Sequence, residues 1–459
     1  MDPAIAPVKS AELPVMPRNV VELVKMVDDG KSFDEMFEKL MNSSMAEDVE
    51  FGDDEVAMGR LRNLFHTLSR PMLRSVLMKH LGPDLYNADR LKENHENVCS
   101  CEHSAGSYVA FIYVPGCWDR FLTAKETRRL VGDLRRYARE VDIFDSCVDE
   151  RGYSQLVVVQ DREDLVFAQE VDDEVRNTVH WDPANPRFER PRFGGVPSTR
   201  PGVQKDMSVR IRHLIGMFLK RCRVRSGNPV RDGGDNSMEV SEDGGDDEDD
   251  DEDGVYQRQS PLMVGNAGVL RNRVVSHYPD TSMDATEKVW ALTLSCLRKR
   301  GMEVYVKVVP LCLAMEEDEI DAAEILGTIL ADSFLPGDGF NVKQPGTRGR
   351  SDRTSDLGFR DAEAHIYYKG WLRDNLAGSI KYHRSLREGR AEKDKVIDQY
   401  NEKLEERRRA RKRLLEAREK LKEAGAGAAD TLEHGEELLA SLRQRNQVME
   451  LFRSPYDEK

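Results

Sequence analysis

The chain has 459 residues, of which 39% are hydrophobic and 33% are charged, and its formal net charge is −15. No stretch approaches the roughly 20 apolar residues that span a bilayer, and the first residues lack the basic flank and apolar run of a secretory signal. We therefore expect neither a membrane protein nor a secreted one. The seven cysteines, an odd number, fit a reducing compartment, so we expect an intracellular location, cytoplasmic or nuclear.

Motifs for common enzyme chemistry are missing from the sequence. It contains no phosphate loop, dinucleotide fingerprint, zinc-protease helix or nucleophile elbow. No pair of carboxylates and no nucleophile with a neighbouring base stands out. We therefore expect a non-enzymatic protein without a cofactor.

Charge is distributed in blocks. Residues 232–253 hold thirteen acidic side chains and no basic one, a composition that predicts a disordered linker because it offers no apolar surface to bury. Immediately before it, residues 187–231 hold twelve Lys and Arg against two acids. This basic strip is either a solvated surface or a binding site for phosphates, and the acidic tract could compete for it.

The N-terminal part predicts helices. Residues 1–17, with four prolines, read as a disordered tail. Residues 18–95 then predict a small helical domain, and Ser32 with Glu35 forms a capping-box pattern at the start of one helix. Gly82-Pro83 is expected to end the last strong apolar stripe of this region.

The pattern changes to β-α-β-β-α after residue 106. Strands are predicted at 108–114, 141–148 and 153–160, with one helix between the first two and another over 163–179. This order is four-fifths of a ferredoxin-like sandwich.

Two short segments of this region resemble signatures of the RNA-recognition-motif family. Residues 112–117 (IYVPGC) are similar to the first-strand signature, and residues 151–158 (RGYSQLVV) are similar to the third-strand signature. Gln155 and Val158 stand where that family has aromatic side chains. The resemblance covers residues 107–181 and implies a fold that binds single-stranded RNA.

The residues themselves predict an aromatic and basic surface. If Tyr113 lies beside Tyr153, two rings and Arg151 share one face of the sheet, which would suit unstacked bases. The alternative is that both tyrosines are ordinary strand residues covered by another element. Further phosphate contacts are expected from the basic strip, namely from Arg210, Arg212, Lys220, Arg221, Arg223 and Arg225.

One cluster could hold a metal. Cys99, Cys101, His103 and Cys117 have the ligand types of a tetrahedral zinc site, but three ligands within five residues strain tetrahedral closure. Chance clustering is the simpler interpretation, so no metal site is assigned.

The second half adds an α-β-α segment and long helices. A helix over 287–300, a strand over 302–309 and a helix over 316–334 are too few to stand alone, so we expect them to complete or cover the sheet of the first half. Residues 341–357 read as a flexible basic loop.

The chain is predicted to be helical from about residue 360 almost to its end. Within 383–424, 25 of 42 residues are charged, and Arg407, Arg411 and Arg418 fall in the seam where a strong coiled coil would be apolar. The basic run 407–413 is a solvated helix face, a nuclear-import patch or a phosphate contact. The last two helices could form a hairpin or meet a partner.

The expected fold class is α+β, with an N-terminal helical domain, a ferredoxin-like βαββα core with an additional αβα segment, and long charged C-terminal helices. The expected boundaries are 1–17 (tail), 18–95 (helical domain), 96–231 (α/β domain with basic extension), 232–258 (acidic disordered linker), 259–358 (αβα segment) and 359–459 (charged helices). The expected function is binding of nucleic acid, single-stranded RNA by preference, with self-association through the C-terminal helices and no membrane. The alternative is a scaffold or assembly protein, such as a viral component, that acts through protein contacts.

Overall fold

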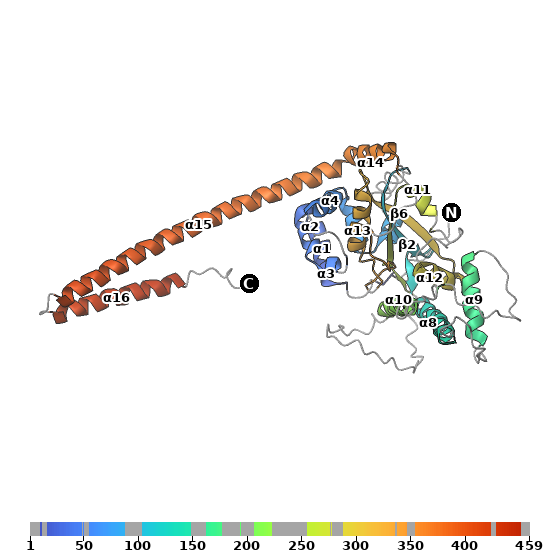
Figure 1. The fold of residues 1–459 in the computed structure, drawn as a ribbon, viewed down its shortest axis with the longest axis horizontal. Helices are drawn as coiled ribbons and strands as arrows, with labels where there is room; N and C mark the ends of the chain where they lie inside the picture. The colour runs from blue at the N-terminus through green and yellow to red at the C-terminus, as the bar shows by residue number, and fades with distance from the viewer. Residues whose placement is uncertain are drawn as a thin grey trace. The chain divides into compact units, whose positions relative to one another are not determined.

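A computed structural model gives the fold (Figure 1). Contacts divide the chain into two compact units, residues 1–382 and 383–459. The structure describes residues 10–11, 16–47, 49, 55–87, 103–147, 162–176, 193, 206–222, 255–275, 277, 288–335, 337–346, 354–423 and 428–450. Among these residues, no helix is long and apolar enough to cross a membrane. The α+β class is confirmed, as is the helical C-terminal region.

The N-terminal region consists of short helices, as the apolar stripes predict. They are α1 (Arg18–Asp28), α2 (Phe33–Met41), α3 (Ser44–Glu47), α4 (Glu55–His66), α5 (Arg70–Leu77) and α6 (Leu81–Asn87). The predicted cap is confirmed, because the Ser32 hydroxyl accepts a hydrogen bond from the Glu35 amide at 3.1 Å. Gly82-Pro83 does not end a helix: α5 already ends at Leu77, and the Gly-Pro pair lies in the first turn of α6, where a proline needs no amide partner.

The main sheet has three antiparallel strands, in the order β5-β2-β6. They are β2 (Gly106–Tyr113), β5 (Leu262–Ala267) and β6 (Tyr305–Leu313). Strand β2 is central, and it pairs with β5 over 106–111 and with β6 over 106–113. Both neighbours of β2 therefore come from beyond residue 254, so the second half of the chain completes the sheet.

Helices cover both faces of this sheet. Alternation along β2 sends Val109 and Phe111 to one face, and Ala110 and Ile112 to the other. The first face packs against the N-terminal helices and α13 (Glu319–Ala331). The second packs against α8 (Ala124–Cys147), α9 (Arg162–Arg176), α10 (Asp206–Cys222) and α12 (Lys288–Lys299). The N-terminal helices therefore share a hydrophobic core with the sheet.

Two short elements lie where the sequence predicts disorder. Strand β1 (Ser10–Ala11), in the expected tail, pairs in parallel with β4 (Tyr256–Gln257), at the end of the expected linker. Strand β3 (Phe121–Thr123) pairs with the other edge of β4. Backbone hydrogen bonds thus order these residues although their side chains give no strand pattern. The acidic run 232–253 itself lies outside the described residues.

The strand predicted over 141–148 is wrong, because α8 continues through Cys147. Leu130, Leu134, Tyr137 and Val141 are all fully buried and lie on one helical stripe. Since this stripe runs on to Val141, the helical period outweighs the β-propensity of the local Val-Asp-Ile-Phe sequence. The βαββα order is therefore not the order of the described elements, and the strand predicted over 153–160 lies outside them.

The later predictions agree better with the structure. The helix predicted over 163–179 is α9, and the segment predicted over 287–334 is α12, β6 and α13. A further short helix, α11 (Leu270–Val275), follows β5. The expected loop over 341–357 is ordered at its start, since the Asn341 amide side chain donates to the Val264 carbonyl and accepts from the Val264 N–H. These two bonds cover the outer edge of β5.

Three helices complete the chain, namely α14 (Asp356–Tyr368), α15 (Gly370–Glu423) and α16 (Ala428–Glu450). The first turns of α15 belong to the first unit, where polar side chains three and four residues apart contact α2 and the end of α4. The Asn375 amide donates to the carbonyls of His66 and Leu68, both at 2.9 Å, and the Trp371 indole donates to the Thr67 carbonyl at 2.8 Å. These side chains satisfy carbonyls that the end of α4 leaves without helical partners.

The next turn of α15 contributes a buried serine. The Ser379 hydroxyl accepts from the Asp34 amide at 3.1 Å and lies 3.0 Å from His66 Nε2. Both side chains are buried, and the hydroxyl already serves a backbone amide of α2. This Ser-His pair therefore anchors α15 on the helical layer.

We predict that Asn375→Ala lowers the free energy of unfolding by about 1–3 kcal/mol, because it leaves buried carbonyls of His66 and Leu68 without a donor. Urea unfolding followed by circular dichroism measures this. Arg373→Ala is the matched control, since that side chain is 87% exposed on the same turn, and it should change stability by less than about 0.5 kcal/mol. Equal stability of the two variants would contradict the anchoring role.

Candidate nucleic-acid interface

An open groove of about 700 Å³ lies between α8 and α10. Its charged lining consists of five arginines and two aspartates: Arg135, Arg136, Arg139, Arg212, Arg300, Asp133 and Asp142. We call this surface the arginine groove. The arginines outnumber the acidic side chains of this lining, which makes the groove a candidate for binding anions.

The helical period explains why the groove is cationic. Leu130, Leu134 and Tyr137 turn to the buried side of α8, so Arg135 and Arg139, four residues apart, share the exposed side. Helix α10 packs against α8 through apolar residues such as Leu214, which leaves Arg212 58% exposed at the groove. The buried stripes of two helices thus place their polar sides along one channel.

Ion pairs hold most of these guanidinium groups in position. Arg300 binds Asp133 with two nitrogens, and Arg212 binds Asp142 at 2.8 Å. Arg136 and Arg139 both contact Asp164 of α9, at 2.7 and 3.2 Å.

The remaining guanidinium group differs. Arg135 is exposed and, within the described part of the chain, pairs with no carboxylate. Five guanidinium groups therefore face three carboxylates, which leaves positive charge available to an anionic ligand.

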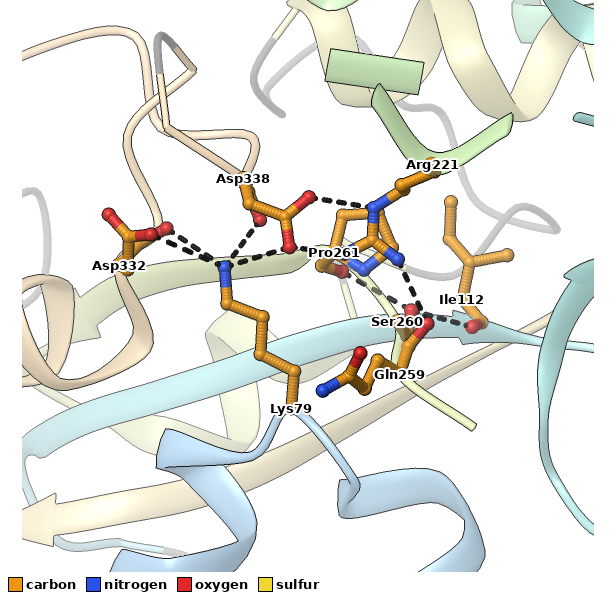
Figure 2. A network of polar contacts seen from close by, with 8 residues as sticks. All are labelled: Lys79, Ile112, Arg221, Gln259, Ser260, Pro261, Asp332 and Asp338. Carbon is orange, nitrogen blue, oxygen red and sulfur yellow. Dashed lines mark hydrogen bonds and ion pairs between the residues drawn. The ribbon is translucent and has the colours of Figure 1, made fainter. Parts of the chain in front are cut away.

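A second charged cluster lies at the far end of α10, and Figure 2 shows its hydrogen bonds and ion pairs. Arg221 donates two hydrogen bonds to the Asp338 carboxylate, at 2.7 and 2.5 Å, and a third to the Gln259 carbonyl. Lys79, which follows α5, donates to the same carboxylate at 3.1 Å and to the Asp332 carbonyl at 3.2 Å. One aspartate therefore links the N-terminal helices, α10 and the loop after α13.

Ser260 extends this network to the sheet through its backbone amide and its hydroxyl. The Ser260 amide donates to the Lys79 carbonyl at 3.1 Å, and the Ser260 hydroxyl donates to the Ile112 carbonyl at the end of β2. The cluster thus joins both covering layers to the sheet they cover (Figure 2).

The residues predicted to contact phosphate have different environments in the structure. Arg212 lines the groove, Lys220 is exposed and Arg210 is half-buried on the same helix. The phosphate contact predicted for Arg221 is not supported. The Arg221 side chain is only 2% exposed and is paired with Asp338, so it is not available to a phosphate. Arg223 and Arg225 lie outside the described residues.

The predicted aromatic surface is only partly described. Tyr113 lies at the end of β2 and is half-buried, whereas Arg151 and Tyr153 lie outside the described residues. The ring next to Tyr113 is Tyr305, its partner in β6, with centroids 5.9 Å apart. Both edges of β2 are occupied over 106–111, so no open edge remains there for a further strand.

Only two of the four candidate zinc ligands lie within the described residues. Cys99 and Cys101 lie outside the described residues, while His103 and Cys117 lie within them. In the described ranges, no three His, Cys, Asp or Glu side chains are grouped so that they could hold a metal ion.

Four groove arginines escaped the sequence reasoning, namely Arg135, Arg136, Arg139 and Arg300. A signal is present in the sequence, because basic residues recur three and four apart along the helix predicted between the strands at 108–114 and 141–148. They were overlooked because acids are interleaved with them, so no block of net charge appears. Arg300 could not have been placed, since only the fold brings the end of α12 beside α8.

Comparison with known proteins finds no matching family model, no matching curated protein and no matching solved structure.

The Asp338 cluster makes stability depend on pH. Burial raises the pKa of Asp338, but the charges of Arg221 and Lys79 outweigh this and hold the pKa below its ordinary value. A carboxyl whose pKa is lower in the folded state stabilises the fold above its unfolded pKa of about 4 and loses that contribution as the pH falls through the folded value.

We therefore predict that Asp338→Asn lowers the free energy of unfolding at pH 7 by about 2 kcal/mol, because it leaves buried Arg221 without a counter-charge. The difference from the wild type should shrink as the pH falls below about 4. Urea unfolding across this pH range measures both effects. Asp374→Asn, at a position 77% exposed, is the control and should match the wild type throughout. A constant difference from pH 7 to pH 2 would contradict the role of this charge.

Proposed function

We propose that this protein binds nucleic acid through the arginine groove, which contacts the phosphate backbone. The observation that carries the proposal is the groove's lining of five arginines against two aspartates. Single-stranded RNA, the expectation from the sequence, is the nucleic acid that we propose.

Geometry favours a phosphate ligand over a simple counter-ion. Guanidinium groups bind phosphates with two parallel hydrogen bonds, and the pairs with Asp133, Asp142 and Asp164 hold four of them in place before a ligand arrives. Preordered side chains lose less entropy on binding. A polyanion in the groove would also release its condensed counter-ions.

The net charge of −15 does not oppose this proposal. The acidic run 232–253 alone carries thirteen of the negative charges, and the remainder of the chain is nearly neutral.

The direct test uses the double variant Arg135→Ala/Arg139→Ala in the full chain. We predict at least a tenfold loss of affinity for a single-stranded oligoribonucleotide at about 100 mM salt. The slope of log affinity against log salt should fall by about 1.4, because two phosphate contacts are lost. Fluorescence anisotropy between 50 and 200 mM salt gives both values.

The matched control is Arg384→Ala/Arg387→Ala, which removes two exposed arginines from α15 in the second unit, outside the basic run 407–413. It should leave the affinity within twofold of the wild type. Equal losses in both double variants would show that charge alone acts, and an unchanged salt slope in the groove variant would contradict the proposal.

We propose self-association as a second property, because apolar side chains are exposed in the second unit. On α16, Leu438 and Leu442 are 53% and 44% exposed and lie four residues apart on one face. On α15, Ile397 and Tyr400 are 55% and 56% exposed. Helices with such stripes bury them against other helices, and a second copy of the chain supplies the same stripes.

We predict that Leu438→Glu/Leu442→Glu reduces the sedimentation-derived mass of the full chain to that of a monomer, because it puts charge into the apolar contact. Arg443→Glu/Arg445→Glu, which changes charge outside this pair on the same helix, is the control and should keep the oligomeric mass. A wild-type chain that is monomeric at tens of micromolar would contradict self-association.

A further inference from the structure

A glycine lies among the arginines on the exposed side of α8. Gly132 lines the arginine groove and is exposed to solvent. On the surface of a helix, the nearest neighbours of a residue lie three and four positions away in both directions. For Gly132 all four of these neighbours are arginines, namely Arg128, Arg129, Arg135 and Arg136. Gly132 therefore lies at the centre of four cationic side chains.

The fold of α8 does not itself require a glycine at this position. The Gly132 backbone is helical, so no positive φ demands glycine. A methyl group added at its Cα would have no packed neighbour within 4 Å among the described residues, so no close approach demands glycine either. Glycine in the middle of a helix lowers its stability relative to alanine. The missing side chain thus leaves an open hollow on the helix backbone, at a cost to the helix.

Contacts with neighbouring helices fix one side of this hollow. Arg136 pairs with Asp164 of α9 at 2.7 Å. Arg300, which follows α12, binds Asp133 with two nitrogens and donates to the Arg129 carbonyl at 3.0 Å. The side of the hollow toward α9 and α12 is therefore ordered before a ligand arrives.

The remaining side of the hollow carries available positive charge. Arg128, Arg129 and Arg135 are exposed. Within the described part of the chain, neither Arg129 nor Arg135 pairs with a carboxylate. Long side chains on a helix lean toward its N-terminus, so Arg135 leans toward the turn that contains Gly132. An anion above Gly132 would therefore meet guanidinium groups from the turns before and after it.

We infer that the hollow at Gly132 is a phosphate subsite, in which one phosphate of the bound nucleic acid lies against the bare backbone of α8. This inference rests on the proposed function and identifies the point of closest approach within the groove. A side chain at position 132 would occupy the space and hold the phosphate oxygens away from the surrounding guanidinium groups. Because guanidinium groups bind phosphates next to any base, the subsite recognises the phosphodiester backbone and not the sequence. Gly132 is thus a positioning residue.

The test uses Gly132→Leu in the full chain, because leucine favours the helix, carries no charge and fills the hollow. Fluorescence anisotropy with a single-stranded oligoribonucleotide should show about a tenfold loss of affinity at about 100 mM salt. The slope of log affinity against log salt should fall by about 0.7, because one phosphate contact is lost although no arginine is removed. Gly132→Ala, which adds one methyl group, should show a smaller loss in the same direction.

The matched control is Gly389→Leu on α15. Gly389 is likewise exposed and helical, and a methyl group at its Cα would have no packed neighbour within 4 Å. None of the residues three and four positions away from it is an arginine. Gly389→Leu should bind the oligoribonucleotide within about twofold of the wild type. Thermal unfolding should find both leucine variants at least as stable as the wild type, because each replaces a glycine within a helix.

The outcomes separate the two proposals. If Gly132→Leu binds like the wild type while Arg135→Ala/Arg139→Ala binds weakly, the phosphate subsite is refuted and the groove stands. If Gly132→Leu binds weakly with an unchanged salt slope, no phosphate contact was lost and the subsite is again refuted. If the wild type binds no oligoribonucleotide at about 50 mM salt, both proposals are refuted.

The alanine variant decides the case in which Gly132→Leu unfolds at a lower temperature than the wild type. Alanine fits the free space around the helix, so Gly132→Ala should remain folded. Weaker binding by Gly132→Ala with a lower salt slope then supports the subsite, and binding equal to that of the wild type refutes it.

Discussion

Strand β2 is hydrogen-bonded along both of its edges, to β5 on one side and to β6 on the other. This pairing joins a segment near residue 110 to segments near residues 265 and 309, so the first and last thirds of the first unit fold around one strand. The side chains of β2 alternate between two apolar faces, and each face must then be covered. The helices from both ends of the unit supply this cover.

Charged side chains connect the helical layers that cover opposite faces of the sheet. Asp338 holds Lys79 from one layer and Arg221 from the other, while Ser260 extends the contacts to β2. A carboxylate shared between two cations offsets the desolvation of all three groups. The same cluster removes Arg221 from the surface, so the basic strip of the sequence is not a uniform binding surface.

The arginine groove follows from the way α8 covers its face of the sheet. Burial of Leu130, Leu134 and Tyr137 turns the arginines of the same helix outward, and the neighbouring α10 adds Arg212. The same helix thus packs its apolar side chains into the core and exposes its arginines to solvent at the groove. Because helices cover both faces of the sheet, the groove is the surface that we propose for nucleic acid.

The sequence by itself determined the local elements with strong periodicity. The α+β class, the Ser32 cap, most of the helices and the strands near residues 110 and 306 follow from apolar spacing and capping residues, which act within a few positions along the chain. The strand predicted at 141–148 failed because the buried stripe of a long helix outweighs local β-propensity. The sequence also indicated Arg212 as an exposed cation.

Only the tertiary structure decided which residues meet. It paired Tyr113 with Tyr305, placed Arg300 beside α8 and buried Arg221 against Asp338, across separations of more than 100 residues. These long-range contacts depend on which strand edges and which faces of the sheet are still uncovered when the whole chain packs. Hydrophobic periodicity and secondary-structure propensity do not predict these contacts, because they describe only the side chains within one segment.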